Sequence, residues 1–124
     1  MSIRPVLSVV DDSDSVRESL PDLLRQAGYD VEAFVSAEEF LASDALSATN
    51  CVILDVGLPG MSGPELQQEL RHRGTTIPIV FITAMDDDAS LRRRLMANGA
   101  AAVLFKPFTD TALLDAVNAA LRTR

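Results

Sequence analysis

The chain has 124 residues, which is enough for one hydrophobic core and too short for two ordinary domains. Its 11 Lys and Arg residues against 18 Asp and Glu residues give a net charge of −7, which disfavours binding to nucleic acids and to anionic lipid. A single Cys and a single His exclude an internal disulfide and a Cys/His zinc site, so any metal must be held by oxygen. With no stretch of transmembrane length and no recognisable leader, we expect one cytoplasmic domain over residues 1–124.

The first half of the chain alternates short aliphatic runs with amphipathic segments. A strand is predicted at Val6–Val10, followed by a helix at Ser15–Ala27 that ends before Gly28. A second strand is predicted at Val31–Val35, where apolar and polar residues alternate as they do nearer the edge of a sheet. The Ser-x-x-Glu spacing that begins at Ser36 is typical of a capping box and predicts the start of a second helix.

The second half repeats the pattern with more uniformly apolar strands, as expected for strands buried on both faces. A second Ser-x-x-Glu spacing begins at Ser62 and predicts the start of a third helix. The remaining elements are predicted, in chain order, as a strand at Cys51–Asp55, a strand at Ile77–Ile82, a helix at Asp87–Asn98, a strand at Ala101–Phe105 and a helix at Thr109–Arg122. Five strands that alternate with five helices predict an α/β fold with a doubly wound parallel sheet.

Polar residues follow four of the predicted strands, where a parallel sheet places its ligand sites. They are Asp11 and Asp12 after the first strand, Asp55 at the end of the third, Thr83 after the fourth and Lys106 after the fifth. Clustered carboxylates favour a hard divalent cation such as Mg²⁺, and a carboxylate beside it can attack phosphorus. The lysine and the threonine supply positive charge and a hydrogen bond to a phosphoryl group. The pattern therefore predicts a phosphoryl-acceptor site.

Each of these residues also has a simpler interpretation when it is taken alone. Asp11 and Asp12 fit a solvated turn or a helix cap, and Lys106 before Pro107 fits the end of a strand. Asp55 is harder to explain by packing, because it directly follows the apolar run of residues 51–54. It is the combination at four strand ends that favours a functional site.

As a set, these segments resemble the response-regulator receiver domains of bacterial two-component signalling. The resemblance rests on Val9-Val10-Asp11-Asp12, Leu54-Asp55-Val56-Gly57-Leu58-Pro59-Gly60-Met61-Ser62-Gly63, Ile82-Thr83-Ala84, Asn98-Gly99-Ala100 and Lys106-Pro107-Phe108. Ser15–Leu20, Gly28-Tyr29 and Phe34–Ala37 are similar to the FixJ-like branch, whose receivers are often joined to LuxR-type helix-turn-helix domains.

The resemblance implies a sheet with strand order 2-1-3-4-5 and a Mg²⁺-dependent reaction in which Asp55 accepts a phosphoryl group. The donor would be a sensor histidine kinase or a phosphotransfer protein. Asp12, Asp55 and the backbone carbonyl of Gly57 would bind Mg²⁺ directly, and Asp11 would act mainly through a metal-bound water.

The resemblance also assigns roles after phosphorylation. Thr83 would move to bond the acyl phosphate, Lys106 would pair with it, and the Lys106-Pro107 peptide would be cis. Receivers commonly carry Tyr or Phe three residues before this lysine, but this chain has Val103, so a rotating aromatic side chain is not available. A homodimer would form through the elements predicted at residues 87–98, 101–105 and 109–122.

The main interpretation is a phosphorylation-controlled switch rather than a turnover enzyme. One alternative is a Mg²⁺-dependent phosphatase or phosphotransferase similar to haloacid dehalogenases, whose Asp-x-Asp pattern is matched by Asp12-Ser13-Asp14. A second alternative is a degenerate receiver that acts only as an interaction domain. We expect no effector domain in residues 1–124, and the sequence leaves open a stand-alone receiver or a piece of a longer regulator.

Overall fold

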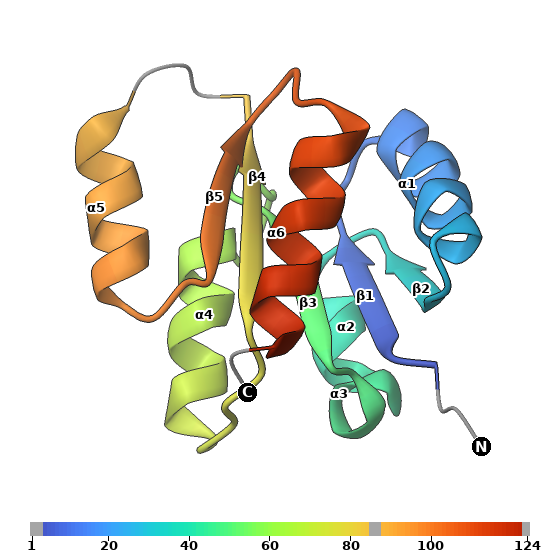
Figure 1. Cartoon of the computed structure of the whole chain (residues 1–124). Helices are drawn as coiled ribbons and strands as arrows, with labels where there is room; N and C mark the ends of the chain where they lie inside the picture. Colours follow the sequence, from blue (N-terminus) through green and yellow to red (C-terminus); the bar gives the residue numbers. More distant parts are fainter. Residues whose placement is uncertain (1–3, 85–87, 123–124) are drawn as a thin grey trace.

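The computed structural model describes residues 4–84 and 88–122. Its elements, in chain order, are β1 Val6–Val10, α1 Asp14–Gln26, β2 Asp30–Phe34, α2 Ala37–Ala42, α3 Ala45–Ala48, β3 Cys51–Asp55, α4 Gly63–His72, β4 Ile79–Thr83, α5 Ala89–Ala97, β5 Ala102–Phe105 and α6 Asp110–Arg122 (Figure 1). None of the helices in the described residues is both long enough and apolar enough to cross a membrane.

The five strands form one sheet with all neighbours parallel, in the order β2-β1-β3-β4-β5. This order confirms the predicted doubly wound α/β fold. The central strand β3 is buried along its whole length, whereas β2 lies at an edge and exposes three of its five residues. The alternating pattern of the second strand thus predicted its edge position correctly.

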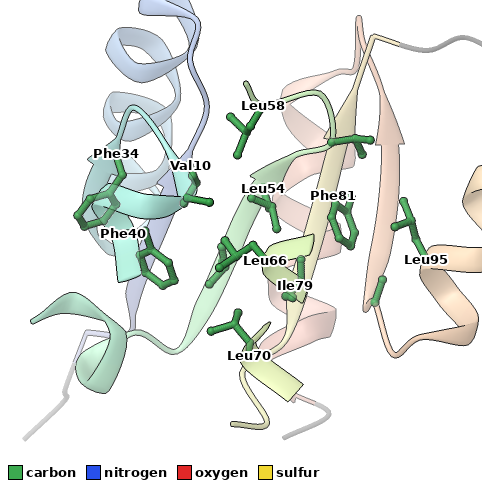
Figure 2. Close-up of a cluster of buried hydrophobic side chains, with 14 of the residues drawn as sticks. Val10, Phe34, Phe40, Leu54, Leu58, Leu66, Leu70, Ile79, Phe81 and Leu95 are labelled. Carbon is green, nitrogen blue, oxygen red and sulfur yellow. The ribbon is translucent and has the colours of Figure 1, made fainter. Parts of the chain in front are cut away.

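Helices cover both faces of the sheet, and each face has its own apolar cluster. On one face, α1 and α6 pack against β1, β3 and β4 through side chains that include Leu24 and Leu113. On the other face, side chains of α2, α4 and α5 pack on the sheet, and Figure 2 shows Phe40, Leu66 and Leu95 among them. Because both faces are covered, the carboxyl ends of the strands remain as the accessible place for a site.

The helix starts follow the predicted capping chemistry. The Ser36 side chain accepts a hydrogen bond from the Glu39 N–H at the start of α2. At Ser62 both halves of the box are present, because Ser62 accepts from the Glu65 N–H and the Glu65 carboxylate accepts from the Ser62 N–H. Gly28 has a φ of 105° just beyond α1, as the predicted helix stop requires.

The fold differs from the prediction in a few places. Residues 4–84 and 88–122 contain six helices instead of five, because the single turn α3 precedes β3. A turn of four residues is too short to show a helical period, so the sequence pattern did not reveal it. β4 begins at Ile79 instead of Ile77, after Pro78, which has no N–H for a sheet bond. Asp88 caps α5, which begins at Ala89, and the predicted start at Asp87 lies outside the described residues.

Candidate phosphoryl-acceptor site

Asp11 and Asp55 are neighbours because of the register between β1 and β3. Val10 lies opposite Leu54, so the residues that follow them in the two parallel strands lie side by side. Side chains along a strand alternate between the two faces of the sheet. Val9 and Ile53 belong to the apolar cluster under α1 and α6, so Asp11 and Asp55, two residues further on, point to the same face. The Asp11 side chain is 1% exposed and that of Asp55 is 11% exposed.

Asp12 completes a group of three carboxylates. One oxygen from each of Asp11, Asp12 and Asp55 lies within 4.8 Å of the other two, and Asp12 is the exposed member. Three negative oxygens at this separation repel one another, and oxygen ligands of this kind suit a hard divalent cation. The donor set therefore fits Mg²⁺.

Lys106 reaches the carboxylates from the far edge of the sheet. It follows β5, which β4 separates from β3, so a long side chain is needed to cross the end of β4. Its Nζ lies 3.2 Å from Asp11 Oδ2 and 3.7 Å from Asp55 Oδ1. The Lys106-Pro107 peptide is cis, and the Lys106 N–H donates to the Thr83 carbonyl at 2.7 Å.

The pKa of Asp55 is raised above its ordinary value of 3.8. Burial is the largest cause, followed by the charge of Asp11, and Asp12 adds to the effect. The Lys106 ammonium and the Gly57 backbone N–H act in the opposite direction. The ionised form of Asp55 is therefore less stable here than in water, and a bound cation would stabilise it.

Thr83 is the last residue of β4 and lies at the same edge of the sheet. Ile82 pairs with Asp55, and Thr83 pairs with Phe105, so Thr83 lies between the strand that ends in Asp55 and the strand that leads to Lys106. Thr83 is 2% exposed. The five predicted side chains are therefore gathered at the carboxyl ends of β1, β3, β4 and β5.

The loop between β3 and α4 carries Gly57, the predicted backbone ligand. Gly57 is exposed, and a Cβ there would meet no atom within 4 Å. At the far end of the loop the Gly63 N–H donates to the Val56 carbonyl at 3.1 Å. A Cβ on Gly63 would lie 2.5 Å from the backbone oxygen of Asp55, so α4 starts directly against the strand end.

Arg17 and Glu38 each bind one loop of the site, and neither residue was predicted to do so from the sequence. The Arg17 guanidinium donates to the Asp11 carbonyl at 3.0 Å and forms an ion pair with Asp14. Asp11 Oδ1 accepts from the Ser13 N–H at 2.8 Å. The Glu38 carboxylate accepts from a backbone N–H of the loop that follows β3. Long side chains that fold back onto loops leave no periodic signal.

Comparisons with known proteins identify the family of this chain. The family model "Response regulator receiver domain" matches residues 7–118. Nodulation protein W of Bradyrhizobium diazoefficiens is 46% identical over 119 residues, which cover 96% of this chain and 52% of that protein. The transcriptional regulatory protein TdiR of Thauera aromatica is 46% identical over 113 residues, which cover 91% of this chain and 49% of that protein. The chain thus spans about half the length of these curated relatives.

Solved structures give the same result. The response regulator StyR superposes with a TM-score of 0.89 at 46% identity, over 98% of this chain and 61% of that one. The structure titled FixJ-N superposes with a TM-score of 0.88 at 33% identity, over 99% and 98% of the two chains. The FixJ-like branch suggested by the sequence is consistent with these relatives. The chain belongs to the response-regulator receiver domains of two-component systems.

Proposed function

We propose that Asp55 accepts a phosphoryl group from a sensor histidine kinase or a phosphotransfer protein. The observation that carries the proposal is the Lys106 ammonium, held 3.7 Å from Asp55 Oδ1 and against the buried Asp11. An Asp55 oxygen bonds to phosphorus while the bond from phosphorus to the donor's imidazole nitrogen breaks, and its electron pair stays on that nitrogen. Lys106 offsets the negative charge of the transferring group.

Mg²⁺ is part of this proposal. Asp12, Asp55 and the backbone carbonyl of Gly57 would bind it directly, and Asp11 would act through a water. When bound, the ion neutralises negative charge on the phosphoryl oxygens. Asp11 also holds Lys106 at 3.2 Å, which keeps the ammonium beside Asp55 before a phosphoryl group arrives.

Thr83 links the site to the output surface in this proposal. Its hydroxyl would bond the acyl phosphate, and its move would shift the segment that leads into α5. Val103 is 3% exposed and lies opposite Phe81 in the sheet, so the switch has no aromatic ring to rotate at this position. We expect displacement of residues 83–95 on phosphorylation, and a phosphorylated structure without it would contradict this route.

The partners follow from the same scheme. The conformational change on phosphorylation would alter the surface formed by α5, β5 and α6, which would bind either a second copy of this chain or other domains. Because the two relatives are about twice as long as the matched region, any control of transcription by a longer protein is part of the proposal. The reaction would take place in the cytoplasm, without direct contact between this domain and nucleic acid or membrane.

The switch interpretation is separated from the phosphatase alternative by turnover. The chain is proposed to act only on its own Asp55, so p-nitrophenyl phosphate should give no steady release of nitrophenol. Acetyl phosphate with Mg²⁺ should give at most one phosphoryl group per chain, because there is one acceptor. Sustained hydrolysis of the ester that is lost in Asp55→Asn would favour the enzyme.

Asp55→Asn is expected to stabilise the Mg²⁺-free protein by about 1 kcal/mol at pH 7. Because the folded-state pKa of Asp55 is raised, the folded protein binds more protons than the unfolded chain between 3.8 and that raised value. The destabilising charge therefore develops as the pH rises through this window, and it is absent below pH 3.8. Urea unfolding from pH 3 to pH 8 measures the difference, and a stability gain that does not shrink toward low pH would contradict the account.

A further inference from the structure

A residue of α2 forms a hydrogen bond with the loop of residues 56–62. The Glu38 carboxylate, near the start of that helix, accepts a hydrogen bond from the Met61 N–H at 2.9 Å. The two residues are 23 positions apart in the chain, so this contact joins the helix after the edge strand β2 to the loop after the central strand β3. The loop carries Gly57, the proposed backbone ligand of Mg²⁺.

The loop is shaped to receive this carboxylate. Gly60 has a φ of 72°, which disfavours side chains, and a Cβ there would lie 2.6 Å from Glu38 Oε2. The next N–H along the chain, that of Ser62, donates to Glu65 at 3.0 Å. Two carboxylates from two helices thus hold consecutive N–H groups of the loop.

The hydrogen bond to Met61 is the largest cause that lowers the pKa of Glu38, and the Glu38 N–H acts in the same direction. Glu38 is therefore ionised at neutral pH although a second carboxylate, Glu65, lies close enough for its charge to be felt. A charge-assisted hydrogen bond of this kind fixes geometry better than a neutral one. At its other end the loop is closed by the Gly63 N–H on the Val56 carbonyl.

We infer that Glu38 is a positioning residue for the Mg²⁺ site, which holds the loop so that the Gly57 carbonyl faces the carboxylates of Asp12 and Asp55. The inference rests on the proposed Mg²⁺-dependent function. Glu38 itself contacts neither the metal nor the phosphoryl group. It acts through the Met61 N–H and the short path from residue 61 back to residue 57.

The test compares Mg²⁺ affinity, measured by isothermal titration calorimetry, among Glu38→Ala, Glu38→Gln and Glu39→Ala. Glu39 is the neighbouring exposed residue at the start of the same helix, so its replacement removes the same charge without touching the loop. Glu38→Ala is expected to weaken Mg²⁺ binding about tenfold. Glu39→Ala is expected to leave it nearly unchanged, and Glu38→Gln, which keeps an acceptor oxygen, to restore most of it.

A second measurement does not depend on the metal. Hydrogen exchange of the Met61 amide in the Mg²⁺-free protein should be faster in Glu38→Ala than in Glu39→Ala. Equal Mg²⁺ affinity in these two variants would overturn the inference. So would equal losses in Glu38→Gln and Glu38→Ala, since charge alone would then explain the effect.

Failure of the proposed function has a different signature. If the unaltered protein binds Mg²⁺ but never gains a phosphoryl group, the proposed function fails while the calorimetric comparison remains valid. If the unaltered protein shows no Mg²⁺ binding at all, both the function and the inference are overturned. Phosphoryl gain is measured by intact mass and Mg²⁺ binding by calorimetry, so the two failures can be distinguished.

Discussion

Gly63→Ala, at the first residue of α4, is expected to destabilise the protein by about 3 kcal/mol. The new Cβ would lie 2.5 Å from the Asp55 backbone oxygen and 2.9 Å from the Val56 Cα. Both are backbone atoms at the end of the central strand, so the helix or the strand must move. We expect the movement to displace Asp55 and to reduce phosphoryl acceptance as well as stability, as measured by urea unfolding and by adduct formation.

Gly57→Ala is the matched control for this effect. A Cβ at Gly57 would meet nothing within 4 Å, so the same added methyl group should change stability by less than about 0.5 kcal/mol. Equal losses of stability in the two variants would show that loss of glycine flexibility, rather than contact with the strand end, is responsible.

Lys106→Met is expected to lower both the stability of the protein and its rate of phosphoryl transfer. The substitution keeps an apolar stem but leaves the buried Asp11 and Asp55 without their cation, at a cost of about 2 kcal/mol in the Mg²⁺-free protein. Phosphoryl transfer from acetyl phosphate should slow about 100-fold, because a preorganised positive charge is lost. Mg²⁺ should bind more tightly than in the unaltered protein, since a competing cation has been removed.

The control for Lys106→Met is Arg92→Met, which removes one positive charge from the exposed side of α5. It should change neither stability nor Mg²⁺ affinity by a measurable amount. Weaker Mg²⁺ binding in Lys106→Met would contradict the account, because it would mean that the lysine organises the carboxylates for the metal rather than competing with it.

The presence of the five strands could be predicted because each has a clear local signal, whereas their order in the sheet was implied by the resemblance to receiver domains. The buried strand at Cys51–Asp55 has the same bounds in the structure as in the prediction. The edge strand was placed one residue late: Phe34 is its last residue, and the Val35 that was assigned to it is 42% exposed. Edge strands have fewer partners, so the apolar pattern defines their ends less sharply.

The sequence predicted which residues of the candidate site lie together, but not the contacts that hold its loops in place. The carboxyl ends of parallel strands share one edge of the sheet, so Asp11, Asp55 and Lys106 were predicted to lie together from their positions at the ends of predicted strands. The contacts of Arg17 and Glu38 depend on the paths of two loops and on the rotamers of long side chains. Neither leaves a repeating pattern in the sequence, so only the folded structure reveals them.

The most direct test of the central claim is the intact mass of the protein after incubation with Mg²⁺ and acetyl phosphate, compared with that of Asp55→Asn. The account predicts one adduct of about 80 Da that requires Mg²⁺ and is absent from the variant. An adduct that persists in Asp55→Asn would place the acceptor elsewhere. No adduct in the unaltered protein, with Mg²⁺ binding established by calorimetry, would contradict the phosphoryl-acceptor function.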